Sequence, residues 1–355
     1  MAWTKPAGHT KEQIDHAGDM LLEELVPPEE TDNAIEVLSN WRACHSYPMH
    51  VFKVRLKSKA KEVDKNALAV QRLKRVPAIK IKLERDYGNG RRIKLSEMQD
   101  IAGCRAILSH VSQVKRLYTD YYLKGDIKHG RVKINDYISH PKKDGYRSYH
   151  IIYSYLSDKT RKKDYNGLLV ELQFRSKLQH QWATAIEIVD FFTKQAIKSN
   201  VGSEPWKEFF RLLSSAFAMN ENCPMVKGTP TDEKELYLKI KEKEVELDVM
   251  KQMNGWMRSF NNLNKMMKTN KQARFFLLDL DISRDVLRVG SYTQEEQAQA
   301  VKDYSDIEKR NLGKKEYDVV LVGADTFSEM KSAYPNYFVD STGFLKKLKE
   351  IVEKY

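Results

Sequence analysis

A short segment near the middle of the chain could present three polar groups on one surface. Strict alternation along 170–175 places Glu171, Gln173 and Arg175 on one face of an extended strand and apolar residues on the other. A carboxylate, an amide and a guanidinium would then share that face. The same pattern is typical of an ordinary half-exposed strand, so neighbouring segments must decide between the two interpretations.

A second carboxylate, Asp100, ends the segment 96–100, which has the pattern of a capped short helix leading into a strand over 104–108. Gly103 would allow close backbone approach at this point. Magnesium prefers oxygen ligands, and two carboxylates from different strands could hold it. Asp100 and Glu171 are therefore a candidate magnesium site.

Several cations lie near Asp100 in the sequence. They are Arg72, Lys74, Lys82 and Arg105. Phosphoryl transfer needs positive charge on the phosphate oxygens with a metal ion between them, and these groups together could supply both. The guanidinium planes of Arg72 and Arg105 could also stack on a nucleobase.

The segment 136–150 contains a loop between a proline and a glycine that presents an aromatic side chain beside basic and hydroxyl groups. Such a loop suits stacking on one base while holding its phosphates. Its candidate binding residues are Lys142, Tyr146, Arg147, Ser148 and His150.

These residues must be positioned by a sheet with helices. Short β-type runs at 104–108, 132–134, 149–155 and 168–174 alternate with helical patterns, and turn signals such as the Gly-Asn-Gly at 88–90 separate them. The alternation predicts an α/β (α+β) fold in which helices pack on the sheet.

The flanking regions predict helices and a second α/β unit. Residues 1–70 are expected to be helical, with one helix beginning after an N-cap pair, Thr31 and Asp32. The pattern is helical from 177 to 271, and an apolar stripe over 238–267 predicts one long helix for core packing or an oligomer contact. The C-terminal elements are expected in the order strand 275–280, strand 286–292, helix 294–310, strand 317–322, helices 326–333 and 342–352.

Composition excludes several classes of protein. The chain has 355 residues, of which 41% are hydrophobic, enough for globular cores. Its apolar runs are far shorter than the roughly 20 residues that cross a bilayer, and the N-terminus lacks a secretory pattern. We therefore expect a cytoplasmic protein with no membrane partner. Three dispersed cysteines, Cys44, Cys104 and Cys223, argue against a disulfide framework and a zinc finger.

The net charge is +12, and most of it lies in one segment. Residues 51–94 hold fifteen Lys/Arg and four Asp/Glu. A phosphate-rich partner would explain this excess, and a solvated helix face is the alternative. A second cluster, Trp41, Arg42 and His45, has no assigned chemistry and is expected to pack at a helix end.

Together and in this order, these segments resemble the synthetase domain of the RelA/SpoT family, the alarmone synthetases that transfer the β,γ-pyrophosphate of ATP to the 3′-hydroxyl of GDP or GTP. The resemblance covers about 71–192. It rests on Arg72-x-Lys74 with Lys82, Asp100-x-x-Gly103-x-Arg105, Asp136-Tyr137 through Gly145-Tyr146-Arg147-Ser148-x-His150, and Glu171-x-Gln173-x-Arg175 followed by His180-x-Trp182.

The resemblance implies a nucleotidyltransferase-like mixed sheet flanked by helices. It also implies that Asp100 and Glu171 would hold Mg²⁺, with Glu171 acting as base toward the acceptor hydroxyl. The ATP-binding residues would be Arg72 and Arg105 on the adenine, with Lys74 and Lys82 on the phosphates. The acceptor-binding residues would be Tyr146, stacked on the base, with Lys142, Arg147, Ser148, His150, Gln173 and Arg175.

Four regions follow from this assignment. They are an N-terminal helical region at 1–70, the synthetase domain at 71–195, a helical connector at 196–270 and a small C-terminal α/β domain at 271–355. The C-terminal domain could offer a strand edge to a protein partner, and its aromatic segment 334–338 could be a docking surface. A stabilising appendage is the alternative. We hypothesise that this domain restrains the synthetase by covering the acceptor side.

The chain departs from the family pattern in several places: Ala78-Ile79 stands where the family often has Ser-Ile, and Arg75 occupies a position that is usually small or polar. The helical carboxylate common in the family is Ile186 here, and whether Glu187 one place later replaces it is left open. No His-Asp dipeptide occurs, so the hydrolase half of long relatives is not expected. We therefore expect a synthetase-only, ATP-dependent pyrophosphokinase without zinc. A homo-oligomer is a further expectation, because small relatives often form tetramers.

Three functions stay open at this point. The first is synthesis of (p)ppGpp from ATP and GDP or GTP. The second is the activity of a toxic relative that transfers pyrophosphate to the 3′ end of tRNA, with the C-terminal domain as antitoxin or sensor. The third is a catalytically inactive nucleotide-binding regulator, against which the complete set of carboxylates and cations argues. The first two share a donor site, so these residues do not separate them.

Overall fold

The computed structural model describes residues 3–23, 28–86, 90–193, 202–261, 264–267, 272–281, 284, 286–311, 317–324, 326–333 and 341–355. The helices are α1 Lys11–Met20, α2 Pro28–Cys44, α3 Ser46–Val63, α4 Val76–Glu84, η1 Leu95–Glu97, α5 Val111–Arg116, η2 Leu117–Leu123, η3 Thr160–Tyr165, α6 Lys177–Thr193, α7 Glu204–Asn220, α8 Glu233–Leu247, α9 Val249–Asn261, α10 Gln297–Arg310, α11 Phe327–Ala333 and α12 Thr342–Val352. The strands are β1 Leu68–Leu73, β2 Ala102–Leu108, β3 Gly130–Asp136, β4 Tyr149–Ser154, β5 Leu169–Ser176, β6 Asn264–Met267, β7 Phe275–Asp281, β8 Val286–Tyr292 and β9 Tyr317–Gly323.

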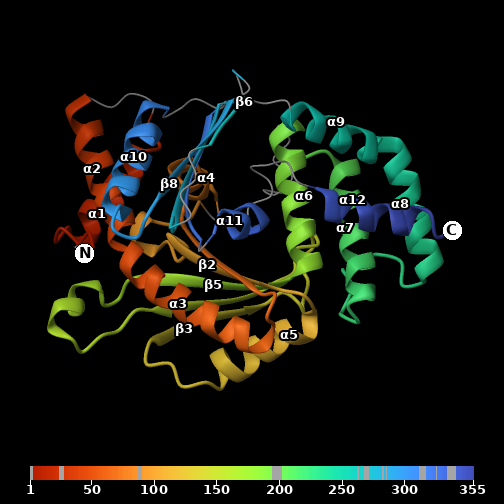
Figure 1. Cartoon of the computed structure of the whole chain (residues 1–355), viewed down its shortest axis with the longest axis horizontal. Helices are drawn as coiled ribbons and strands as arrows, with labels where there is room; N and C mark the ends of the chain where they lie inside the picture. The colour runs from red at the N-terminus through yellow and green to blue at the C-terminus, as the bar shows by residue number, and fades with distance from the viewer. Residues whose placement is uncertain are drawn as a thin grey trace.

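Within the described part of the chain, the strands form one mixed sheet in the order β3-β4-β5-β2-β1-β9-β7-β8-β6. β2 and β5 run parallel, and β1, β4 and the C-terminal strands β7 and β9 pair antiparallel with their neighbours. Helices lie on and around this sheet (Figure 1). The mixed α/β fold expected from the alternation of patterns is confirmed.

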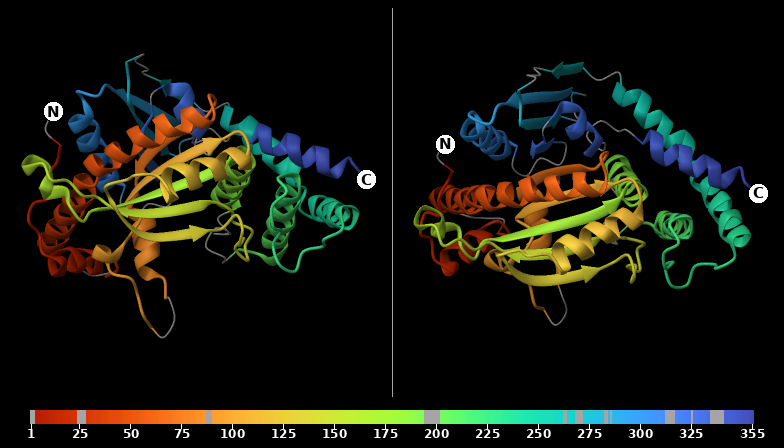
Figure 2. Two further views of the ribbon diagram at one scale, coloured as in Figure 1. Left: turned by 90° about the horizontal axis from the view of Figure 1, so that it is seen from below. Right: turned by 60° about the horizontal axis from the view of Figure 1, so that its bottom comes forward.

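β1 joins the candidate site to the C-terminal elements. It pairs with β2 along its length, and on its other edge Gln71 and Arg72 pair with Gly323 and Val322 of β9. The C-terminal strands therefore continue the sheet that carries the candidate site, and Figure 2 shows them, in blue, beside α3. β1 was not foreseen as a strand, and it contains the expected boundary at 71. The division into four domains stays a prediction.

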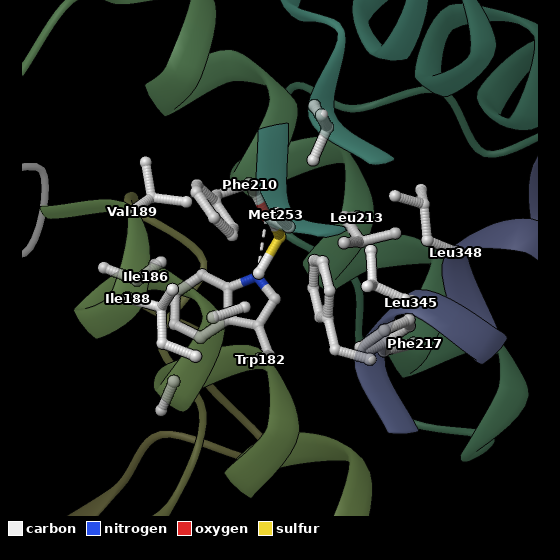
Figure 3. Packing of buried hydrophobic residues seen from close by; sticks show 14 of the residues in the cluster. Trp182, Ile186, Ile188, Val189, Phe210, Leu213, Phe217, Met253, Leu345 and Leu348 are labelled. Carbon is white, nitrogen blue, oxygen red and sulfur yellow. Dashed lines mark hydrogen bonds between the residues drawn. The ribbon is translucent and has the colours of Figure 1, made fainter. Parts of the chain in front are cut away.

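Two large apolar cores lie on the sheet. One packs α3, α5 and η2 against β2, β4 and β5, with the buried aromatic residues Phe52, Tyr122 and Phe174. The other gathers α6, α7, α9 and α12 around Trp182, whose indole Nε1 donates to the Phe210 carbonyl at 2.8 Å. Figure 3 shows this second core from close by. Burial of such large side chains supplies the main free energy that fixes the site-bearing strands.

The prediction of one long helix over 238–267 is wrong. Asp248 adopts a left-handed backbone with φ 48°, which ends α8 and lets α9 start in a new direction. Part of the expected stripe is exposed, since Val245 has 71% of its surface accessible. Residues 264–267 form β6, so the helical pattern also ends before 271.

Three smaller expectations also change. α2 begins at Pro28, so Thr31 lies inside the helix and does not cap it; proline is favoured in a first turn because its missing N–H needs no partner there. Gly103 makes no unusually close approach, since an added Cβ would lie 3.7 Å from the nearest atom. The turn at 88–89 and the aromatic segment 334–338 lie outside the described residues.

No helix in the described ranges combines the length and the apolar character that crossing a bilayer requires.

Candidate active site

Asp100 lies between two lysine side chains at one end of the sheet. Lys74 Nζ donates to Asp100 Oδ2 and Lys82 Nζ to Asp100 Oδ1, each at 2.8 Å. Lys74 follows β1, Lys82 lies in the last turn of α4, and Asp100 precedes β2. The three side chains are 19–24% exposed, so they are sheltered but open to a ligand. The structure thus joins three of the residues that the sequence predicted for the donor and the metal.

The sheet register brings Glu171 to the same place. Gly103 on β2 pairs with Glu171 on β5 and with Arg72 on β1. The side chains of Glu171 and Arg72 therefore lie on the same face of the sheet, on either side of Gly103. Asp100 lies three residues before Gly103. Glu171 is also close enough that its charge partly opposes the lowering of the Asp100 pKa by the lysines. The two acids therefore face one region, as the sequence predicted.

Glu171 is the centre of a hydrogen-bond network on this face. His150 Nδ1 lies 2.9 Å from Glu171 Oε1, and Gln173 Nε2 donates to Glu171 Oε2 at 2.7 Å. His150 Nε2 lies 2.7 Å from Tyr146 Oη, which also accepts a bond from Arg175 Nη2 at 2.6 Å. The alternation read from the sequence thus becomes one connected set of groups.

Arg105 extends this network toward the residues that are predicted to bind the donor. Its Nε donates to Gln173 Oε1 at 3.2 Å, and the register places Arg105 directly opposite Gln173. Arg72 lies on the adjacent strand β1, two residues after Val70, which pairs with Arg105. The side chains of Arg72 and Arg105 are therefore on the same face of the sheet. Both arginines are partly exposed, as a role in stacking on a base requires. That role stays a prediction.

Charge pairing holds both carboxylates ionised. Burial alone would raise the pKa of Asp100, but the cations Lys74 and Lys82 outweigh it and the pKa lies below its usual value. Burial likewise opposes ionisation of Glu171, yet the charge and hydrogen bond of His150 bring its pKa far below the ordinary range. For His150 burial lowers the pKa, but the charges of Tyr146 and Glu171 outweigh burial, so the pKa lies above its usual value.

The loop that is predicted to bind the acceptor is shaped by Gly145. Its φ of +96° favours glycine, and an added Cβ would lie 2.9 Å from both Ser214 and Trp182. Beside it, Lys142 Nζ lies 5.3 Å from the centre of the half-buried Tyr146 ring. The close packing of Gly145 against α6 and α7 fixes where Lys142 and Tyr146 stand.

Arg147 and Ser148 are not part of the open site. Arg147 is 2% exposed, with its Nη1 2.9 Å from Glu221 Oε2. Ser148 is fully buried and donates to the Phe174 carbonyl at 3.1 Å. In this structure both side chains bond to neighbouring elements and support the loop, and the acceptor-binding role expected for them stays a prediction.

Comparison with known proteins identifies the segment that carries these groups. Residues 71–189 match the family described as the region found in RelA / SpoT proteins. We call this matched segment the RelA/SpoT region. It contains Asp100, Glu171 and the matched cations, and it ends inside α6.

Two GTP pyrophosphokinases of Bacillus subtilis (strain 168) are similar in sequence. YjbM is 25% identical over 135 residues, which are 38% of this chain and 60% of the relative. YwaC is 33% identical over 87 residues, which are 24% of this chain and 40% of the relative. The chain thus spans less than two thirds of the length of either relative.

Solved structures of small alarmone synthetases are also similar. The Bacillus subtilis small alarmone synthetase 1 bound to its product pppGpp is 23% identical, with a TM-score of 0.41 over 53% of this chain and 91% of the other. The small alarmone synthetase 2 of the same species is 22% identical, with a TM-score of 0.42 over 52% of this chain and 94% of the other.

The RelA/SpoT region is held in part by residues outside it, which the sequence did not identify as important. Arg42 of α2 donates from Nε to the Lys74 carbonyl at 3.0 Å and forms an ion pair with Glu308 of α10. Glu308 Oε1 in turn accepts from the backbone N–H of Val76, at the start of α4. The sequence does not indicate this role for Arg42, because its partner Glu308 lies 266 residues away.

The groups present suit a magnesium ion bound jointly with phosphates. No set of three or more His, Cys, Asp and Glu side chains is gathered for a metal anywhere in the described part of the chain. Magnesium sites in phosphoryl transfer commonly use one or two carboxylates and take their other ligands from phosphates and water. Asp100 and Glu171 of the RelA/SpoT region match that pattern.

An apolar residue, Ile186, occupies the position in α6 where the family commonly has a carboxylate. Ile186 is 5% exposed and packs in the core around Trp182. Glu187, one position further along α6, is partly exposed. Whether Glu187 takes over the role of the family carboxylate stays an open prediction.

Proposed function

We propose that the protein transfers the β,γ-pyrophosphate of ATP to the 3′-hydroxyl of GDP or GTP, forming (p)ppGpp. The observation that carries this proposal is the arrangement of Lys74 and Lys82 on the two oxygens of Asp100, beside Glu171. Such a set can neutralise a polyphosphate from both sides, with cations on its oxygens and a metal ion between them. The sequence similarity to two GTP pyrophosphokinases supports the same reaction.

The donor side would work by exchange of partners. Without ligand, Lys74 and Lys82 neutralise Asp100. When ATP and Mg²⁺ bind, the two lysines would pair with the phosphates and Asp100 would help to hold the metal ion, so no charge would be left unpaired. Arg72 and Arg105 hold the adenine. The magnesium ion would neutralise developing charge on the transferred group.

Glu171 is better suited to holding the metal ion than to accepting a proton. A general base works best when its pKa lies near the working pH, whereas the pKa of Glu171 is far lower. Its two oxygens retain lone pairs for a metal ion while they accept bonds from His150 and Gln173. We therefore propose Glu171 as a magnesium ligand first, and its role as base stays a weaker prediction.

The acceptor would lie between the Tyr146 loop and the network of β4 and β5. Tyr146 would stack on the acceptor base, and Lys142 would meet its phosphates. His150, Gln173 and Arg175 hold one another in place, which spares the entropy of ordering them when the acceptor binds. A reaction that consumes ATP supports a cytoplasmic location. A homo-oligomer and a protein partner at the C-terminal elements stay predictions.

The direct test is to incubate the purified chain with γ-labelled ATP, Mg²⁺ and, in separate reactions, GDP, GTP or total tRNA. Label on a guanine nucleotide is expected. Label on tRNA alone would show that the acceptor is wrong while the donor chemistry stands, and no labelled product with any acceptor would refute the proposal.

Two substitutions and the removal of Mg²⁺ test the roles of individual groups. Asp100→Asn and Glu171→Gln should each lower transfer by orders of magnitude, about 10²–10³-fold, because each removes a group that acts on transition-state charge. Asp120→Asn, an exposed change in η2, is the matched control. A chelator should abolish transfer and added Mg²⁺ should restore it; transfer that persists in chelator would contradict the magnesium site.

A further inference from the structure

A second basic pocket lies on the opposite side of β1 from the proposed ATP site. Its volume is about 290 Å³, near the lower end of the range for small-molecule sites. α3 supplies His50, Lys53 and Lys57 at helical spacing along one face, and the C-terminal elements supply Arg274. The pocket therefore exists only where the C-terminal strands meet the RelA/SpoT region.

Three cations converge on this pocket. Burial lowers the pKa of Lys53, and the charge of Arg274 lowers it further, whereas Glu329 of α11 acts in the opposite sense. For Lys57 burial again leads and Lys53 adds to the lowering, whereas Glu329 again opposes it. These effects show that Lys53, Lys57 and Arg274 are near enough to repel one another. None of the residues that line the pocket in the described part of the chain is acidic.

The wall of the pocket also contains an unsatisfied amide. Gln71 of β1 is 2% exposed, and its Oε1 is buried without a hydrogen-bond partner among the described residues. A buried acceptor left unsatisfied costs about 1–3 kcal/mol, so a ligand that donates a hydrogen bond here would recover that free energy. This polar wall is independent of the three cations.

We propose that this pocket binds a small molecule carrying a phosphate group, no larger than a mononucleotide. Lys53, Lys57 and Arg274 would meet the phosphate, since converging cations that repel one another gain most from a multiply charged anion, and guanidinium groups match phosphate geometry. Gln71 would accept a hydrogen bond from the uncharged part of the ligand. This inference does not rest on pyrophosphate transfer.

The test measures binding by calorimetry, so that it is independent of activity. The full chain carrying Lys74→Met and Lys82→Met, which removes the phosphate contacts of the donor site, is titrated with inorganic pyrophosphate, with GMP and with malonate. Saturable binding of pyrophosphate and GMP is expected, with malonate much weaker. Absence of binding by both phosphate compounds, or malonate as tight as either, would overturn the proposal.

Position is tested by a matched pair on α3. Adding Lys53→Met should raise the dissociation constant for pyrophosphate at least about tenfold. Lys59→Met removes the same charge outside the pocket and should leave that constant unchanged. Equal effects of the two changes would overturn the assignment. Circular dichroism checks folding of each variant, and Lys57→Met replaces Lys53→Met if the latter does not fold. If the double variant of the donor site does not fold, Lys53→Met and Lys59→Met are made in the wild-type chain instead. The number of pyrophosphate molecules bound per chain is then measured, and we expect Lys53→Met to lose one binding site and Lys59→Met to lose none.

Discussion

Arg42 on α2 and Glu308 on α10 form a buried ion pair that ties the C-terminal elements to the segment between β1 and α4 that carries Lys74. Their side chains are 4% and 7% exposed. Burial opposes the charge on Arg42, but Glu308 and Tyr304 outweigh it and raise its pKa. Because the same two side chains also bond the backbone of Lys74 and Val76, this pair connects the position of α10 to the proposed donor site.

Glu308→Ala should destabilise the protein strongly. It leaves the Arg42 guanidinium buried without its counter-charge, which costs about 3–5 kcal/mol. Urea unfolding measures the change, and Asp306→Ala, on the exposed side of the same helix, should alter the free energy of unfolding by about 0.5 kcal/mol or less. If the two variants unfold alike, the ion pair has little structural importance.

Lys82→Met should lower kcat/KM for ATP by about 10²–10³-fold, because it removes a cation from the transferred phosphates. Lys80→Met is the matched control: it removes the same charge from α4, but at an exposed position away from Asp100. Initial rates at varied ATP concentrations separate the two. A comparable loss in both variants would mean that the general charge of α4, and not the contact at Asp100, determines the rate.

Tyr146 should ionise near neutral pH. Burial opposes ionisation, but the charges of Arg175 and His150 outweigh it and lower the pKa to about 7. The ultraviolet tyrosinate band of the wild type should therefore contain a component that titrates near pH 7 and is absent in Tyr146→Phe. Tyr137→Phe should retain it, because burial raises the pKa of Tyr137.

The same shift has a consequence for stability. The pKa of a tyrosine in an unfolded chain is about 10, so the lowered value in the folded state contributes stability that is fully present above about pH 10. That contribution declines below this pH and is lost as the pH falls through about 7. Stability of Tyr146→Phe relative to wild type should therefore fall as the pH rises from 7 to 9. A constant difference would contradict the assignment.

Gly145→Ala should cost more than Gly167→Ala. Both glycines have a left-handed φ, so alanine is strained at each by about 1–3 kcal/mol. Only at Gly145 would the added Cβ also crowd Ser214 and Trp182, which adds about 1–3 kcal/mol. Thermal unfolding measures both variants, and Gly145→Ala should also raise KM for the acceptor. Equal costs would show that the packing of the loop does not matter.

The sequence by itself determined the local order of the site. Alternation along β5 placed Glu171, Gln173 and Arg175 on one face, and the structure connects them there as predicted. Most strand positions were also predicted, including β8 at its observed bounds. These features depend on spacing of two residues along an extended chain, which is a property of neighbours in the sequence.

Tertiary structure decided what depends on distant partners. The sequence could not show that Arg147 would be buried against Glu221, or that Asp248 would divide the expected long helix. Nor could it pair Arg42 with Glu308, since no local period relates residues so far apart. Packing settles such matters, because a charged side chain becomes a ligand-binding group or a structural support according to which surface covers it.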